Sequence, residues 1–208
     1  MKNFFLTLVC ALTFSSLANA QIATENVVQF DKTSTRPGFS ATFSNDVKDV
    51  TTAVKNRMTK EAPKKKAVSA GKNLTKYEAV SSNNICLQTC DVYFLIEGNS
   101  KSAKVTLFVS KGYENFVSSS NDQETADLAK TFVSSLAKDI ETVTLANQID
   151  AQAKIVSKAE NEYKKSVSNK EKLQKELQKA EDNVKNADAE RQKQKALLEE
   201  LRSKAANQ

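Results

Sequence analysis

Apolar residues recur at alternating steps of four and three through the C-terminal third of the chain, from Leu145 to Ala205. This segment contains neither glycine nor proline, and a repeat sustained over roughly eight heptads is typical of a coiled coil. One helix cannot bury such a stripe against itself, so the segment predicts a helix that needs a partner surface. We call the a and d positions the seam and place Leu145 at d; its large apolar residues are Leu145, Ile149, Val156, Tyr163, Leu173, Leu177, Val184, Leu198 and Leu201.

Polar residues interrupt the seam at Ser166 and Lys170, and at the same point Ser168 with Glu171 spells a second capping box. A helical hairpin that folds back there would bury the stripe within one chain. Neither glycine nor proline marks a bend at this point, so the sequence favours a continuous helix over a hairpin. Lys170 and Arg191 occupy a positions, where polar residues weaken a coiled coil and help to fix its register.

The region before the seam shows strand patterns. Alternating residues such as Val105, Leu107 and Val109 predict an antiparallel sheet with one buried face and one wetter face. Phe108 interrupts the polar face, which suggests that something covers part of it. Pro37-Gly38 is interpreted as a turn. About four to five strands are expected, at residues 22–30, 39–43, 73–80, 85–97 and 103–110.

Helix patterns complete this region. Val50, Val54 and Met58 form one buried stripe of a short helix, which Asn45 or Asp46 caps and Pro63 ends. Asn121 and Glu124 resemble a capping box at the start of the long helix, and we expect Phe132 and Leu136 to pack on the strands. The expected fold class is α+β: residues 21–144 form a small domain whose sheet packs against the short helix and the start of the long one, and residues 145–208 form the coiled-coil helix.

The first twenty residues have the features of a cleaved signal peptide. Lys2 supplies a positive charge, residues 4–14 are apolar, and Ala18-Asn19-Ala20 is a small-x-small cleavage site. The apolar run is too short to span a bilayer as a helix. We therefore expect cleavage near Ala20, a periplasmic or otherwise exported protein, and no transmembrane segment in the mature chain.

Positive charge gathers between residues 48 and 76, although the whole chain carries a net charge of only +6. One interpretation is a patch that binds an anionic envelope component such as lipopolysaccharide or an acidic glycan. Nucleic acid is disfavoured because no aromatic residues interleave with the lysines. The favoured alternative is a solvated helix face that runs into a lysine-rich loop. The candidate anion patch comprises Lys60, Lys64, Lys65, Lys66 and Lys72.

Two cysteines, Cys86 and Cys90, remain after the predicted cleavage. In a straight strand their Cα atoms would lie ~13 Å apart, which is too far for a disulfide. A disulfide therefore requires a tight turn or bulge at residues 87–89; two half-buried thiols are the alternative. The chain has no histidine, which is the commonest metal ligand and the commonest general base at neutral pH. We expect no catalytic residues, no metal site and no cofactor.

Two strand segments, Asp-Val-Tyr-Phe-Leu-Ile-Glu at 91–97 and Val-Thr-Leu-Phe-Val-Ser-Lys-Gly-Tyr-Glu-Asn-Phe-Val at 105–117, carry a family resemblance. They resemble uncharacterised exported Bacteroidetes proteins that have a small α/β domain followed by a long C-terminal coiled-coil helix. The resemblance implies periplasmic or envelope residence and brings no catalytic residues. The function expected is a non-enzymatic interaction or scaffold module that binds itself or another helical protein through the coiled coil; the alternative is an electrostatic binding module.

Overall fold

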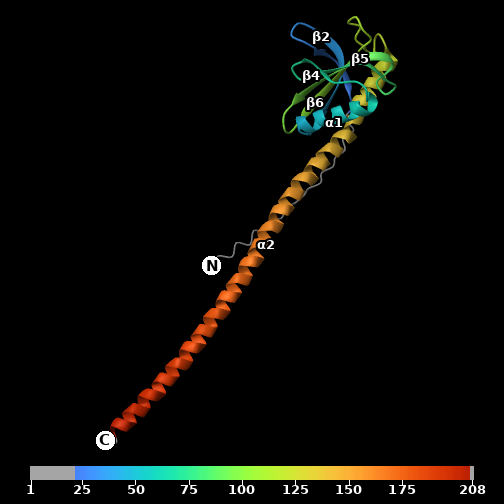
Figure 1. Cartoon of the computed structure of the whole chain (residues 1–208). Coiled ribbons are helices and arrows are strands. Elements are labelled where there is room, and N and C mark those ends of the chain that lie inside the picture. The colour runs from blue at the N-terminus through green and yellow to red at the C-terminus, as the bar shows by residue number, and fades with distance from the viewer. Residues whose placement is uncertain (1–21, 207–208) are drawn as a thin grey trace. The chain divides into compact units, whose positions relative to one another are not determined.

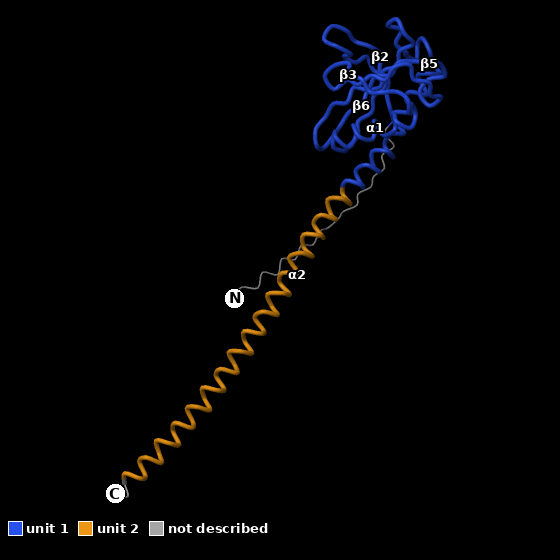
Figure 2. The backbone as a smooth tube through the Cα atoms, in the orientation of Figure 1, with its two compact units in different colours: residues 1–147 blue, residues 148–208 orange. Residues whose placement is uncertain are grey.

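The computed structural model describes residues 22–206, so the predicted signal peptide at 1–20 lies outside the described residues. Six β-strands precede a long C-terminal helix, and a short helix lies between the second and third strands (Figure 1). The chain divides into two compact units (Figure 2). Unit 1 ends at Asn147 and unit 2 begins at Gln148.

Unit 1 contains one sheet in which every pair of neighbouring strands is antiparallel. The strand order is β1-β2-β6-β5-β4-β3. With the two helices this is an α+β fold, so the predicted fold class is confirmed, although the sheet has six strands where about four to five were expected. The strands are β1 (Thr24–Gln29), β2 (Thr35–Phe43), β3 (Val68–Gly71), β4 (Leu74–Ser82), β5 (Cys86–Gly98) and β6 (Ala103–Ser110).

The additional strand is β3, which lies at one edge of the sheet. All four of its residues are exposed. A strand with no buried face needs no alternation of apolar and polar residues, and that alternation is the signal that marks a half-buried strand in a sequence. Val68 pairs with Lys76 and Gly71 with Leu74, so β3 forms by hydrogen bonding to β4 alone.

The turn predicted at Pro37-Gly38 was wrong, because both residues lie within β2. The chain reverses earlier, between β1 and β2. There the carboxylate of Asp31 accepts hydrogen bonds from the backbone N–H groups of Thr33 and Ser34, each at 2.8 Å. An aspartate that bonds the backbone two residues on forms a turn of its own without glycine or proline.

Local packing explains why β2 accepts both residues. Pairing with β6 begins only at Phe39, so Pro37 lies where β2 is paired on one side and its missing N–H breaks no bond to β6. A Cβ atom on Gly38 would lie 2.7 Å from the Cγ2 of Thr106 and 2.8 Å from the Cε1 of Phe108. Gly38 is therefore required by close side-chain contact and not by a turn.

Helix α1 (Val47–Glu61) matches the prediction. The Asp46 side chain caps it by accepting a hydrogen bond from the N–H of Lys48 at 2.8 Å. The expected residues Val50, Val54 and Met58 are all buried.

Helix α2 (Gln123–Ala206) runs without interruption, and its cap differs from the prediction by one residue. The Asp122 carboxylate accepts a hydrogen bond from the N–H of Thr125 at 3.2 Å. Asn121 is occupied elsewhere: its side-chain oxygen accepts from the N–H of Ser118 and its amide donates to the carbonyl of Phe116, both at 2.8 Å.

The main core lies between one face of the sheet, α1 and the first part of α2. Phe132 and Leu136 of α2 are fully buried in it, as predicted. The ring of Phe132 lies 6.0 Å from that of Phe94 in β5, measured between centroids. Burial along α2 continues to Ile140 and ends before Leu145.

A smaller core covers the opposite face of the sheet. It is built on Leu74, Leu95, Phe108 and Phe116. Phe30, which follows β1, packs edge-on against Phe108 and Phe116 with ring centroids 5.2 and 5.0 Å apart. This contact is the cover that the apolar Phe108 requires on an otherwise polar face.

Candidate interaction site

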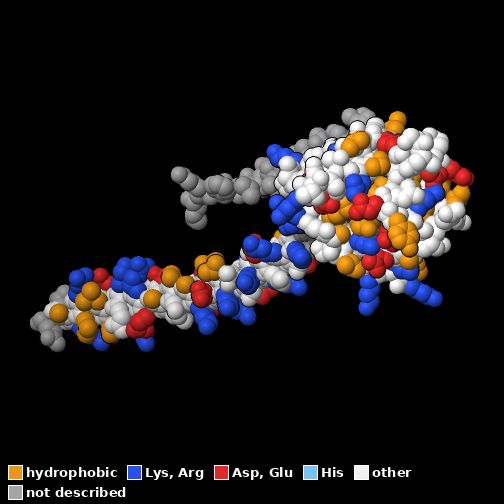
Figure 3. Space-filling model, turned by 90° about the horizontal axis from the view of Figure 1, so that it is seen from above, with side chains coloured by type: hydrophobic (Ala, Val, Ile, Leu, Met, Phe, Trp, Pro, Cys, Tyr) orange, Lys and Arg blue, Asp and Glu red, His pale blue; other side chains and the backbone are white. Residues whose placement is uncertain are grey.

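The seam, which begins at Leu145 in the last residues of unit 1 and continues through unit 2, is exposed along its whole length. Figure 3 shows apolar side chains at intervals along this helix, interspersed with lysine, arginine and acidic residues. Scattered exposed apolar residues are normal on a protein surface, but a continuous stripe marks an interaction site. The nine large apolar seam residues, Leu145, Ile149, Val156, Tyr163, Leu173, Leu177, Val184, Leu198 and Leu201, are between 38% and 71% exposed.

Three further apolar residues widen the stripe beyond the a and d positions used in the sequence analysis. Ile155 and Leu197 occupy g positions and Val167 an e position, and all three are exposed. The e and g positions flank the seam in a coiled coil. The signal for them was present in the heptad pattern, but only the a and d positions were counted.

Charged residues of unit 2 make few contacts with one another. Between its described side chains three ion pairs form, all three or four residues apart: Arg191 with Asp188, Arg202 with Glu199, and Lys204 with Glu200. Exposed pairs of this kind contribute only ~0.3–0.5 kcal/mol each. Side-chain charges therefore do little to stabilise this helix as a single strand.

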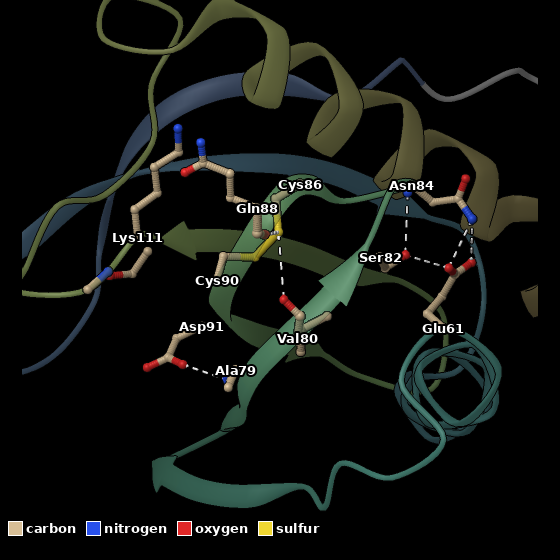
Figure 4. Close-up of a disulfide and its surroundings, with 12 residues drawn as sticks. Glu61, Ala79, Val80, Ser82, Asn84, Cys86, Gln88, Cys90, Asp91 and Lys111 are labelled. Atoms are coloured by element: carbon tan, nitrogen blue, oxygen red, sulfur yellow. Dashed lines mark hydrogen bonds between the residues drawn. A yellow bond between two sulfur atoms is a disulfide. The ribbon is translucent and has the colours of Figure 1, made fainter.

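In unit 1, Cys86 and Cys90 form a disulfide whose Cα atoms lie 6.8 Å apart (Figure 4). The strand register explains the short separation. Ser82 of β4 pairs with Cys86 and Val80 with Cys90, so two residues of β4 span the same length as four residues of β5. Residues 87–89 form the bulge that the disulfide requires.

The disulfide is buried in the main core, since both cysteines are at most 3% exposed. The Sγ of Cys86 lies 2.9 Å from the carbonyl oxygen of Gln88. A disulfide sulfur carries no hydrogen, so this is a contact and not a hydrogen bond. Burial protects the disulfide from reductants and from thiol exchange, which favours a structural role over a redox role.

A polar network around Glu61 joins the end of α1 to the turn after β4 (Figure 4). Its carboxylate accepts hydrogen bonds from Ser82 at 2.7 Å, from Asn84 at 2.9 Å, and from Arg57 at 2.8 Å. Burial alone would raise the pKa of Glu61, but these hydrogen bonds together outweigh it and the pKa is lowered. Arg57 also pairs with Asp139 of α2 at 3.0 Å, so the network ties both helices to the sheet.

A second polar cluster stabilises a bulge in β4. Ala79 has a positive φ of 49°, and its N–H donates to the Asp91 carboxylate at 2.8 Å. Lys76 pairs with Asp91 at 2.9 Å and with Glu78 at 3.0 Å. The hydrogen bonds that the Lys76 ammonium group donates, first the one to Asp91 and then the one to Glu78, raise the pKa of Lys76. Lys76 therefore has partners within the sheet and is not available as part of an anion patch.

The structure does not gather the five lysines of the candidate anion patch into one place. Lys60 lies in the last turn of α1, and residues 64–66 follow it before β3. Lys72 lies beyond β3, in the turn to β4, so the length of that strand separates it from Lys66. All five side chains are exposed, and none forms an ion pair with a described residue.

An open hollow of about 490 Å³ lies between the β1–β2 and β3–β4 turns, on the face of the sheet that carries the smaller core. Leu74, Leu95 and Phe30 provide its apolar surface. Charges of both signs surround it, and none of the candidate site residues except Lys72 lies there. The sequence offered no signal for it, because it arises from two turns that are 40 residues apart in the chain at about Asp31 and Gly71.

Comparisons of this chain with protein-family profiles, with curated protein sequences and with solved structures find no match. No helix among residues 22–206 combines the length and the apolar character that crossing a membrane requires. In the same part of the chain, no three Cys, Asp or Glu side chains group together in a way that could hold a metal ion. The interaction site is therefore interpreted from the geometry alone.

Proposed function

We propose that this protein is an exported interaction or scaffold module that works without catalysis. The seam of unit 2 forms a coiled coil with a second helix, either from another copy or from a different helical protein, and unit 1 is the folded domain that this contact joins to its partner. The observation that carries the proposal is the stripe of nine exposed apolar residues on one uninterrupted helix.

Two physical arguments support pairing of unit 2. Most helical stability in proteins comes from packing of an apolar face and not from intrinsic propensity. A long helix can also stand alone when many ion pairs link its turns, but unit 2 has only three between its described side chains. A partner helix is therefore the main source of stability available to it.

Export is supported by two independent features. The N-terminal sequence has the charge, apolar run and cleavage motif of a signal peptide. The Cys86–Cys90 disulfide belongs to a class of bond that persists in oxidising compartments such as the periplasm. The absence of histidine from the chain lowers the expectation of catalysis.

Sedimentation velocity and circular dichroism of the full-length protein test the proposal together. We expect high helicity that persists on heating only where the protein is concentrated enough to associate, or where a partner helix is added. A monomer whose C-terminal segment is non-helical at every concentration, with and without extract of the cell envelope, would contradict it.

A second candidate function is binding of an anionic envelope polymer by Lys60 and residues 64–66. One observation favours it: these four lysines are exposed and have no ion-pair partner among the described residues. Such binding weakens steeply as salt is added. Changing residues 64–66 to glutamate should abolish binding to lipopolysaccharide, whereas Lys72→Glu, beyond β3, should have little effect; unchanged binding in the triple variant would exclude this function.

A further inference from the structure

We propose that the partner of the seam is a second copy of this chain, lying antiparallel, with the two-fold axis crossing between Gln178 and Lys179. The inference rests on the proposed function, because it names the occupant of the same seam. It is carried by how the seam and its flanking charges complement themselves when the sequence of unit 2 is reversed and laid against itself.

Several layers of this register pair apolar with apolar residues, and one pairs polar with polar. Leu173 faces Val184 of the second copy, and Val156 faces Leu201, so large apolar residues pair near the axis and near both ends. Ser166, a polar interruption of the seam, faces Arg191. A buried polar group destabilises least when it meets another that can hydrogen bond to it, so Ser166 and Arg191 accommodate one another.

Small residues of one helix also face large residues of the other. Ala159 faces Leu198, and Ala180 faces Leu177. Facing large with small side chains fills an interhelical space without voids. Ala187 faces Lys170, so the aliphatic part of the lysine can lie across the alanine while its ammonium group reaches solvent.

The flanking charges favour the same arrangement. In an antiparallel pair, e positions meet e positions and g positions meet g positions. Glu160 then meets Lys195 of the second copy. The two-fold axis repeats this attraction, because Lys195 of the first copy meets Glu160 of the second. Across residues 151–206, no facing e or g pair brings like charges together in this register.

A parallel pair in register is much less favourable. It sets Lys170 against Lys170 and Arg191 against Arg191 within the seam, and it brings Glu176 near Glu181 on both flanks. It also stacks each seam alanine on its own copy, which leaves gaps that the antiparallel pair fills with Leu or Lys. Like charges at facing positions discriminate strongly between coiled-coil alternatives.

The nearest competing register is antiparallel and shifted by one heptad. It gains contacts between Ile155 and Leu197. However, it sets Glu160 against Asp188 twice on the flank of the e positions and Glu162 against Glu190 twice on the flank of the g positions, where Glu176 also meets its own copy. Five facing pairs of carboxylates at neutral pH oppose this register, so the axis between Gln178 and Lys179 is preferred.

Cysteine crosslinking of the full-length protein tests both direction and register. Leu173→Cys and Val184→Cys are made separately in a Cys10→Ala background, so that the only other cysteines are the two joined in the disulfide and the introduced cysteine is the only free thiol. The crosslinked dimer should form when the two variants are mixed and not with either variant alone. Leu177→Cys mixed with Leu173→Cys is the matched control, which crosslinks only in the shifted register.

Crosslinking of either single variant with itself would overturn the proposal in favour of a parallel pair, and crosslinking of the control mixture would overturn the register.

A charge exchange provides a second test, which is needed if the cysteine variants associate weakly. Glu160→Lys or Lys195→Glu alone should raise the Kd for self-association roughly tenfold, because two attractive pairs become repulsive, and the double variant should restore it. No restoration contradicts the antiparallel pair. A monomeric protein that still binds another helix through the seam overturns this inference and leaves the proposed function standing.

Discussion

Replacing the two leucines nearest the centre of the seam should separate the associated chains. The perturbation is Leu173→Gln together with Leu177→Gln, which keeps good helix formers at both positions. In the single chain these side chains are 64% and 60% exposed. This exposed surface is what a partner helix would cover.

The magnitude follows from that exposure. Complete burial of a leucine contributes about 1.5–3 kcal/mol, so covering about three-fifths of each contributes roughly 1–2 kcal/mol. A pair of identical chains buries both residues twice, so the variant should lose roughly 4–8 kcal/mol of association free energy. This loss weakens association about a thousandfold or more.

Sedimentation velocity over a range of protein concentrations measures the effect, and circular dichroism reports the accompanying loss of helix. Lys175→Gln with Asp182→Gln is the control, because both positions lie on the face opposite the seam and the net charge is unchanged. If the leucine variant associates as tightly as the wild type, or if the control is weakened equally, the seam is not the interface and the reasoning fails.

Three further predictions concern unit 1. Cys86→Ala with Cys90→Ala should cost about 2 kcal/mol, because the disulfide closes a short loop; a lower Tm with unchanged self-association is expected, and an unchanged Tm would contradict a structural role. The pKa of Glu61 in the folded state lies below its ordinary value of 4.5, so its stabilising contribution is complete above that pH and is lost as the pH falls through the lowered pKa. Glu61→Gln should therefore flatten the decline of Tm in acid, and parallel declines would exclude this carboxylate as the cause. Phe30→Ala should lower the free energy of unfolding by about 3 kcal/mol in urea, since three aromatic rings lose an edge-on neighbour; a change below about 1 kcal/mol would show that the smaller core contributes little.

Periodicity predicted the parts of the fold in which one face is buried. The stripe through Val50, Val54 and Met58 and the packing of Phe132 and Leu136 were readable because burial on one side leaves a pattern in the sequence. Strand β3 left none, since all of its residues are exposed and only backbone pairing holds it.

The turn between β1 and β2 was misplaced for a different reason. Pro37 and Gly38 are strong local turn signals, but tertiary contacts decide their conformation: Gly38 admits the side chains of Thr106 and Phe108, which are about 70 residues away in the sequence. The turn is formed instead by Asp31 and the N–H groups it accepts from.

The candidate site was predictable to a similar extent. The heptad repeat identified the seam, because an exposed stripe follows from the same spacing that a buried one would. The spread of the lysines could not be predicted, since their positions depend on the hairpin of β3 and β4. The short distance between Cys86 and Cys90 could not be predicted either. It depends on a bulge that the pairing of β5 with β4 imposes, and residues 87–89 themselves carry no signal for it.

Hydrogen exchange along unit 2 of the full-length protein tests the central claim most directly. If the seam pairs with a second helix, the amides of residues 148–206 should be protected at high protein concentration and should lose that protection on dilution. Exchange at the rate of an unstructured peptide at every concentration, with or without envelope extract, would contradict the account.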